Sequence, residues 1–539
     1  MSDGSDRFVD EATGFVLGVG DLRERLAPDG EAGRLRAKHP RTYRPGDREA
    51  WLTELEALET VERWSDAHPD DHDALRSTLS QIPRIDDVIA ALRSQTTLTD
   101  EGLFGLKQFC FYGAHALEIA ADLVEALDRP SRWRSRLVDI AEAIHPDGTD
   151  TPRFHLSGEL DPDLADLLER QRRLQEELQA LRDDLEAAIL DNHGGRFDLQ
   201  GVFRPATEVD EATLEADDAL TYRAGGWRPA SEELERREAK LEEVRADIDA
   251  AEHRVRQQLT ATLAGQAGWL GEVADFLAEL DVRLAKVRLK GRLDGCWGRW
   301  LDEEDPGAPA ASPHFALSGG RDPQIADRLR ANDAELQPVD FALGDRPAVV
   351  TGPNMGGKSA LLRLAGLSHW CAQHAMPVPA DAFAFRPVAG VVYVGSEEPS
   401  ARDASHGLSS FGREVRRLVD AREAADPPTL WLLDEVGRGT HPADGAELAI
   451  DVIAQLHAAG HSVMAATHFP AVAACDDVET YRIRGITEPN RLEEVLGGAV
   501  DVDEIALVLG EAMDYQPVAA EGGEVPRDAR LVARALGLG

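Results

Sequence analysis

The sequence predicts an all-α core that carries a long antiparallel coiled-coil arm with a small strand-containing tip, followed by a C-terminal α/β domain. Three observations predict it. Apolar residues recur at helical spacing from about residue 72 to 145. Two heptad runs flank a segment rich in Gly, Pro and aromatic residues. After residue 315, short apolar runs alternate with helical patterns, as in a parallel sheet.

The first two parts of the chain are an N-terminal segment, 1–70, and a helical core, 71–160. The N-terminal segment mixes short helical patterns with a basic patch, RLRAKHPRTYRPGDR at 34–48. This patch reads either as a solvated loop or as a local contact for a polyanion. The helical core contains the runs IPRIDDVIAALRSQTTL and EGLFGLKQFCFYGAHALEIAADLVEAL, whose apolar spacing is that of packed helices.

The arm is predicted at 161–265. Its two heptad runs contain Leu167, Leu174, Leu178, Leu181, Leu185 and Ala188, then Leu234, Leu241, Val244, Ile248, Ala251 and Val255. Between them, a tip at about 191–232 is richer in Gly, Pro and β-branched residues, which favours strands. At 1.5 Å per residue, each helix of the arm would extend on the order of 30 Å.

A return helix and linker are predicted at 266–315, and the α/β domain at 316–539. The return helix is TLAGQAGWLGEVADFLAELDVRLAKVRLKG, and the linker contains DEEDPGAPAASPH, an acidic and Pro-rich stretch.

A phosphate-binding loop is predicted at the start of the α/β domain. The run RPAVVTGPNMGGKSALLRLAGL begins as an apolar strand and opens a helix at Ser359, so that the pattern GxxxxGK followed by Ser stands in its required context. Glycines let successive N–H groups approach phosphate oxygens. We expect Lys358 to reach the β- and γ-phosphates of ATP, and Ser359 to hold Mg²⁺. The expected nucleotide-binding residues are Gly352, Pro353, Asn354, Met355, Gly356, Gly357, Lys358 and Ser359.

Two later strands supply the remaining groups that ATP hydrolysis needs. PPTLWLLDEVGRGT ends a buried strand in adjacent acids: Asp434 is suited to bind Mg²⁺, and Glu435 to orient and deprotonate the attacking water. HSVMAATHF presents Thr467 and His468 at a strand's carboxyl end, where ligands bind in open α/β sheets. We expect Glu435 and His468, which would sense the γ-phosphate, to be catalytic, and Ser359 and Asp434 to be the metal ligands.

Together these motifs resemble the ATPase domain of the MutS family of DNA mismatch repair ATPases, through TGPNMGGKS, ATHF, and LLDEVGRGT followed by Asp444 and Gly445. The resemblance implies an α/β P-loop NTPase domain of ABC-like type. The family also carries a Ser-Thr-Phe motif with a Glu three residues after the Phe, matched here by Ser409, Ser410, Phe411 and Glu414. The resemblance implies that Ser409 contacts ATP bound to the opposite subunit, in a homodimer or a heterodimer with another MutS-like chain.

The resemblance covers about residues 75–539 and is strongest after 318, where GGRDPQI is similar to the family's entry segment. The first 70 residues are too few for the mismatch-recognition and connector domains, and no Phe-x-Glu occurs. We therefore expect a short family member that lacks both, which argues against the usual mismatch reading and against coupling to MutL. Because the sequence ends at ARALGLG soon after the ATP motifs, we expect no Smr-type nuclease.

The resemblance implies duplex DNA as partner, clamped at mismatched, branched or junction structures in mismatch repair or recombination. Arg196 and Arg204 in the tip are candidate contacts, or simply exposed arginines. An alternative is an SMC/ABC-type DNA-associated ATPase, since residues 317–320 read LSGG; in SMC proteins, however, the coil separates the two ATP motifs, whereas here it precedes both. A third interpretation is a regulatory scaffold that binds ATP without a DNA substrate, for which Glu435 would be dispensable.

The amino-acid composition indicates the environment of the protein more than it indicates a binding partner. The chain has 99 Asp plus Glu against 58 Lys plus Arg, a net charge of −41. Dense carboxylates keep a protein hydrated in concentrated salt, where the Debye length is about 3 Å, so we expect a halophilic cytoplasm; an acidic protein of ordinary cytosol is the alternative. The four cysteines make no CxxC pair, and no stretch resembles a signal peptide or membrane span, which favours a cytoplasmic protein. Counterion release contributes little in such salt, so we expect a dimer to retain DNA by enclosure.

Overall fold

The chain forms two units that share one helix. The computed structural model describes residues 8–146, 154, 156, 158–206, 210–301, 314–331, 334–352, 357–395, 410–486 and 513–520. Unit 1 comprises Met1–Asp29, Gly33–Pro69 and Glu279–Gly539, and unit 2 comprises Gly30–Ala32 and Asp70–Ala278. The division falls inside α13, Ala267–Arg292. Most of the N-terminal segment therefore belongs to the unit that holds the α/β domain.

Unit 2 is built mainly of helices. α7 packs against α9, and Gly113 in α7 permits their close approach, since a Cβ there would lie 3.2 Å from Leu137 Cδ1. Among the described helices of the whole chain, none combines the length and apolar character needed to cross a membrane. The helices that precede the long pair are α5 (Pro69–Leu79), α6 (Asp86–Ser94), α7 (Asp100–Ile119), α8 (Ala121–Ala126) and α9 (Arg132–Ile144).

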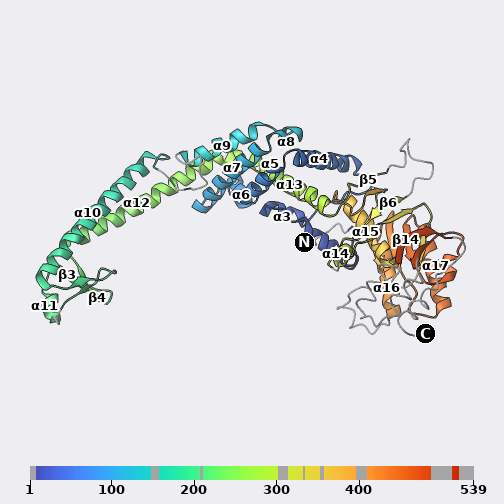
Figure 1. Ribbon diagram of the computed structural model, residues 1–539. Helices are drawn as coiled ribbons and strands as arrows, with labels where there is room; N and C mark the ends of the chain where they lie inside the picture. Colours follow the sequence, from blue (N-terminus) through green and yellow to red (C-terminus); the bar gives the residue numbers. More distant parts are fainter. Residues whose placement is uncertain are drawn as a thin grey trace. The chain divides into compact units, whose positions relative to one another are not determined.

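Two 32-residue helices of unit 2, α10 (Pro162–His193) and α12 (Glu232–Leu263), lie side by side (Figure 1). Both begin at capping residues that the sequence makes recognisable: Asp161 accepts hydrogen bonds from the N–H groups of Asp163 and Leu164, and Ser231 accepts one from that of Leu234. The buried residues of α12 are apolar except for Thr260: Leu234, Leu241, Val244, Ile248, Ala251, Val255, Leu259, Thr260 and Leu263.

A small sheet joins the two long helices. Its strands are β1 (Arg196–Phe197), β2 (Phe203–Arg204), β3 (Leu220–Arg223) and β4 (Gly226–Pro229), in the order β1-β2-β4-β3, with the short helix α11 (Glu211–Glu215) between β2 and β3. Here the heptad interpretation is wrong by one residue: Ala188 is exposed, whereas Ile189 is buried with Phe203, Leu214 and Leu220. The last turns of α10 face this sheet, so their buried side shifts.

Unit 1 contains two sheets. The six-stranded sheet has the order β10-β11-β12-β8-β13-β14, and every neighbouring pair is parallel except β13 and β14. Its strands are β8 (Ala348–Thr351), β10 (Gly390–Val394), β11 (Thr429–Asp434), β12 (Ser462–Ala466), β13 (Glu479–Ile486) and β14 (Met513–Ala519). The four-stranded sheet, β5-β9-β6-β7, consists of β5 (Arg299–Trp300), β6 (Phe315–Gly320), β7 (Val339–Leu343) and β9 (Ala382–Phe385).

Side chains of the six-stranded sheet are buried on both faces. In β11, Leu430 and Leu432 belong to one apolar cluster and Trp431 and Leu433 to another, as the alternation of a strand requires. A strand buried on both faces reads as a continuous apolar run, which is the case for TLWLLD. The helices of this part of unit 1 are α14 (Pro323–Arg330), α15 (Lys358–Gln373), α16 (Ser410–Ala424), α17 (Pro442–Ala458) and α18 (Pro470–Ala473).

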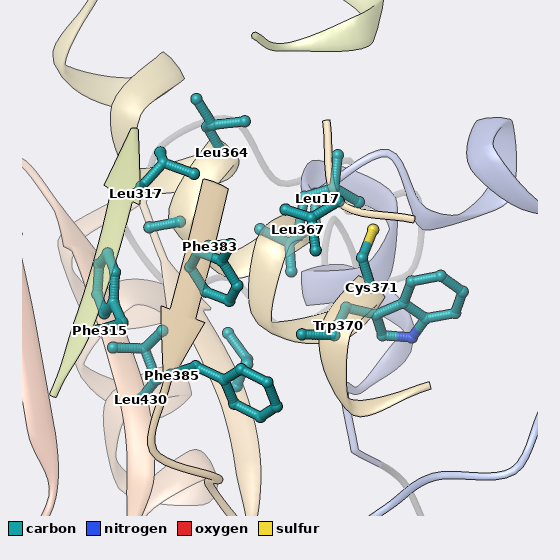
Figure 2. Packing of buried hydrophobic residues seen from close by; sticks show 14 of the residues in the cluster. Leu17, Phe315, Leu317, Leu364, Leu367, Trp370, Cys371, Phe383, Phe385 and Leu430 are labelled. Carbon is teal, nitrogen blue, oxygen red and sulfur yellow. The ribbon is translucent and has the colours of Figure 1, made fainter. Parts of the chain in front are cut away.

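The N-terminal segment packs on α15. Leu17 and the α15 residues Leu364, Leu367 and Trp370 form one apolar cluster with Phe383 (Figure 2). The C-terminal end of α15 is closed by hydrogen bonds from the same segment, because Trp51 Nε1 donates to Ala372 O (2.8 Å) and the Tyr43 N–H donates to Gln373 O (2.7 Å). The segment's helices are α1 (Glu11–Val16), α2 (Val19–Leu26), α3 (Glu31–Ala37) and α4 (Arg48–Ala67).

A buried histidine lies in the middle of this core. His369 on α15 lies among the rings of Phe315, Phe383 and Phe385, with centroids 4.9–6.3 Å away. Its Nδ1 lies 3.0 Å from Ala365 O, whereas Nε2 has no hydrogen-bond partner among the described residues. Burial lowers the pKa of His369 to about 3. Folding therefore favours the neutral ring.

We predict that His369→Phe reduces the acid sensitivity of unit 1. A histidine whose pKa is about 3 when folded and about 6.5 when unfolded contributes stability above pH 6.5 that is lost as the pH falls toward 3. At pH 5 this loss is about 2 kcal/mol. In urea unfolding followed by tryptophan fluorescence, the decrease in unfolding free energy from pH 7.5 to 5 should be smaller in the variant by about that amount. The exposed His457, replaced by Gln, is the control; equal decreases in H369F and wild type would contradict the prediction.

Candidate ATP-binding site

Three parallel strands end at one edge of the six-stranded sheet. Asp434 at the end of β11 is opposite Ala466 of β12, which is opposite Val350 of β8. The sheet continues one step beyond β12, since the Thr467 N–H donates to Val350 O (3.1 Å). Segments separated by more than a hundred residues therefore reach the same edge, where open parallel sheets bind ligands.

The loop after β8 leads into the N-terminus of α15. Gly352 ends the described part of this loop, and Gly357 precedes the helix with φ +82°, a conformation that favours glycine. A Cβ on Gly357 would also lie 3.0 Å from Cδ1 of Tyr515 in β14. Lys358 and Ser359 occupy the first turn of α15, where the N–H groups of the helix N-terminus and the helix dipole favour an anion.

Lys358 is buried close to two carboxylates. Its Nζ donates to Gly352 O (3.0 Å) and lies 4.0 Å from Glu435 Oε1, and the side chain is only 5% exposed. Burial lowers the pKa of Lys358, although the charges of Glu435 and Asp434 act in the opposite direction. A buried cation at a helix N-terminus suits a polyphosphate, whose charge would offset this loss of hydration.

Asp434 is buried at the end of β11 and is held by a neighbouring strand. The hydroxyl of Tyr393, in β10, donates a 2.6 Å hydrogen bond to Asp434 Oδ2. Gly395 follows β10, and a Cβ there would lie 2.9 Å from Asp434 Cβ. The Asp434 carboxylate and the Ser359 hydroxyl are oxygen donors of the type that Mg²⁺ prefers. These residues therefore fit a magnesium–nucleotide complex.

Glu435 adopts a conformation that is unusual for its type. Its φ is +55°, its N–H donates to Ala466 O (2.9 Å), and Arg438 Nη1 donates to its Oε2 (2.5 Å). A residue with a Cβ is strained in the left-handed region and stays there only where its surroundings hold it, which is common at functional sites. The turn thus places a largely buried carboxylate directly after Asp434.

The turn after β11 is held by two close contacts. The Gly437 N–H donates to Glu414 Oε1 on α16 (2.5 Å), and burial raises the pKa of Glu414 although this hydrogen bond opposes the shift. Gly437 also packs backbone to backbone on Gly445 of α17, since a Cβ on Gly437 would lie 2.5 Å from Gly445 O. Gly437 and Gly445, two of the three glycines in the GRGT…DG pattern, therefore serve one contact.

His468 lies at the same edge but is exposed. It follows Thr467, whose Oγ1 accepts a hydrogen bond from the Phe469 N–H (3.1 Å), and its ring lies 4.3 Å from that of Phe469.

The structure thus brings together Lys358, Glu435 and Asp434, with Ser359 and Gly357 on the adjoining turn. Pro353, Asn354, Met355, Gly356 and Ser409 lie outside the described residues.

Sequence reasoning missed Tyr393 and Arg438 as neighbours of the acids. Arg438 was detectable, because it lies three residues after Glu435 within the motif. Tyr393 was not, because no local pattern tells which strand lies beside β11.

Comparison with known proteins identifies relatives of this chain. Residues 348–486, from β8 to β13, match the family model MutS domain V. The chain is 33% identical over 220 residues to a protein named endonuclease MutS2 from Pelotomaculum thermopropionicum, covering 40% of this chain and 26% of that protein. It is 33% identical over 295 residues to a DNA mismatch repair protein MutS from Azorhizobium caulinodans, covering 52% and 30%. The match spans less than a third of either relative's length.

We predict that Gly437→Ala destabilises unit 1 more than Gly460→Ala does. Both glycines have φ +85°, which costs an alanine about 1–2 kcal/mol. At Gly460 the nearest atom to a new Cβ is 3.8 Å away, whereas at Gly437 backbone atoms lie 2.5–3.0 Å away. Overpacking should add about 1–3 kcal/mol.

Urea unfolding of the two variants measures this difference. Equal losses of stability in the two variants would show that the contact with Gly445 is not tight.

Proposed function

This chain belongs to the MutS family, and we propose that the edge formed by β8, β11 and β12 binds ATP with Mg²⁺ and hydrolyses it. One observation carries the proposal. The Lys358 ammonium, at the start of α15, lies 4.0 Å from the Glu435 carboxylate, which follows the buried Asp434. P-loop hydrolysis needs three groups at one place: a cation that binds phosphate, a ligand for magnesium and a base that accepts a proton from water.

The roles follow from charge and position. Lys358 would bind the β- and γ-phosphates, and backbone N–H groups of the P-loop would donate hydrogen bonds to them. Pro353, Asn354, Met355 and Gly356, which the sequence also predicts to bind nucleotide, lie outside the described residues. Ser359 and Asp434 hold Mg²⁺, which when bound neutralises charge on the phosphates.

Two residues act at the γ-phosphate. Glu435 accepts a proton from the attacking water, and its hydrogen bond from Arg438 and its backbone bond to Ala466 limit where its carboxylate can lie. His468, exposed at the same edge, senses the γ-phosphate. Ser409 would complete the site from a second subunit, so that hydrolysis is shared across a dimer.

We further propose that ATP controls clamping of a dimer on duplex DNA, at mismatched, branched or junction structures. Two relatives carry names that refer to DNA repair or nuclease function. The long pair α10 and α12 supports this proposal, because paired helical arms are able to enclose a duplex without relying on a basic surface. Because the chain has a net charge of −41 and counterion release contributes little in concentrated salt, enclosure by a dimer would retain DNA better than attraction by a basic surface.

The SMC-type alternative is disfavoured by the surroundings of the LSGG residues. They lie in β6, where Ser318 Oγ and the Gly319 N–H both donate to Asp340 Oδ1 of β7. An element whose polar groups join two neighbouring strands is a structural one. The scaffold alternative, ATP binding without turnover, is left to experiment.

We predict that Glu435→Ala binds ATP normally and does not turn it over. Loss of a general base lowers turnover by about 10²–10⁴-fold, whereas phosphate affinity depends on Lys358 and the loop. Binding of a fluorescent ATP analogue and release of phosphate measure the two properties separately. Glu423→Ala, which removes an exposed carboxylate of α16, is the control. Wild-type turnover in E435A would refute the role of Glu435, and absence of turnover in the wild type would favour the scaffold alternative.

We predict that ATP makes retention on DNA depend on the ends of the DNA. Homoduplex, mismatched and four-way-junction DNA, each open-ended or end-blocked, would be compared in multimolar KCl. Retention should persist on the end-blocked form and be lost from the open-ended one, and E435A should prolong it. Indifference to every DNA, with ATP hydrolysis unchanged by DNA, would exclude the clamp.

A further inference from the structure

A tyrosine outside the recognised motifs contacts the acid expected to hold magnesium. The Tyr393 hydroxyl donates to Asp434 Oδ2 at 2.6 Å, and Tyr393 has no exposed surface. A hydrogen bond to a charged acceptor is strong, and burial removes competition from water. Tyr393 and Asp434 belong to adjacent parallel strands, so the bond joins two rigid elements.

The strand that carries Tyr393 is held in turn by the N-terminal segment. The Tyr393 N–H donates to Thr13 Oγ1 (3.1 Å), and the Val391 N–H donates to Phe8 O (2.9 Å). β10 is the edge strand of the sheet, and these bonds occupy its outer side. Thr13 is fully buried and lies in the first turn of α1, where its N–H donates to the capping residue Asp10 (2.7 Å).

Arg417 joins this arrangement to α16. Its Nη2 lies 2.8–2.9 Å from both carboxylate oxygens of Asp10 and donates to Thr13 Oγ1 (3.3 Å). Burial raises the pKa of Asp10, but hydrogen bonds from Arg417 and Thr13 outweigh this effect and keep it below its usual range. The same helix carries Glu414, which accepts the hydrogen bond from Gly437 in the turn after β11.

The orientation of the Asp434 carboxylate decides whether it can present an oxygen to a metal ion. A carboxylate rotates easily about its last bond, and a metal ligand must present an oxygen in one direction. Second-layer hydrogen bonds commonly provide this orientation, and their loss costs about 10–100-fold in metal affinity or activity. Tyr393 engages one oxygen of Asp434, and the bonds to Thr13 and Phe8 hold the strand from which it projects.

We propose that Tyr393 is a positioning residue for Asp434, and that Asp10, Thr13 and Arg417 act through Tyr393. The N-terminal segment would thereby contribute to Mg²⁺ binding at the ATP site. This inference rests on the proposed function, because it concerns the Mg²⁺ that ATP hydrolysis uses. It assigns a role to Asp10 and Thr13, which precede Tyr393 by 380 positions or more in the sequence.

The test is a magnesium titration of nucleotide binding by the full-length chain. A fluorescent ATP analogue at fixed concentration is titrated with Mg²⁺, and separately bound in EDTA. Tyr393→Phe should raise the Mg²⁺ concentration for half-maximal binding by about tenfold, and leave binding in EDTA unchanged. Tyr481→Phe is the matched control: it lies in β13 of the same sheet, but its hydroxyl faces Ala342 O and Glu479.

A second pair of variants, Thr13→Val and its control Thr53→Val, tests the N-terminal segment. This test remains valid if Y393F folds poorly. Thr13→Val removes the acceptor and keeps the shape, so the Mg²⁺ midpoint should rise by a few-fold; in the Y393F background the extra shift should be much smaller, because both changes act on Asp434. Thr53→Val, which loses only a local bond to Glu49 O on α4, should shift nothing.

The outcomes separate this inference from the proposed function. Wild-type Mg²⁺ midpoints in both Y393F and T13V, with lower thermal stability only, would show that these contacts are merely structural and would overturn the inference while ATP hydrolysis stood. Absence of nucleotide binding by the wild type, with or without Mg²⁺, would overturn the proposed function and this inference with it. Additive shifts in the double variant would overturn the part assigned to Thr13.

Discussion

The parallel register of β8, β12 and β11 is the constraint on which the site depends. Because Val350, Ala466 and Asp434 are opposite one another, the segments that follow these strands meet at one edge. A slip of one residue would turn Asp434 to the other face, since side chains alternate along a strand. The apolar clusters on both faces prevent this slip, because Leu432 and Leu433 are each buried on opposite sides.

α15 converts this register into a charged site. Its body is buried, largely through apolar side chains, so Lys358 and Ser359 are carried on a helix that cannot shift without disrupting the core. Its C-terminal carbonyls are bound by Trp51 and Tyr43 of the N-terminal segment, and Lys286 of α13 donates to His374 O (3.3 Å) just beyond it.

Local sequence patterns, such as capping residues and apolar spacing, explain more of the structure of unit 2 than of unit 1. Asp161 and Ser231 cap α10 and α12 with the residue types that capping requires, and apolar side chains at helical spacing are buried along both helices. The ion pairs across the two helices, Arg182 with Glu238 and Arg237 with Glu177, are largely exposed and contribute little at high salt. Packing of these apolar side chains therefore holds the helix pair.

The sequence by itself predicted the MutS resemblance, which the match to MutS domain V confirms, and the groups on which the proposed chemistry rests: the P-loop and the acids Asp434 and Glu435. It did so because each motif is a short run whose residue types are dictated by phosphate, metal and water. Only the tertiary structure decided that β10 lies beside β11, that Tyr393 therefore reaches Asp434, and that Thr13 binds Tyr393 across 380 positions. Strand order and the docking of a distant segment depend on which buried surfaces fit one another, and no local pattern of residues contains that information.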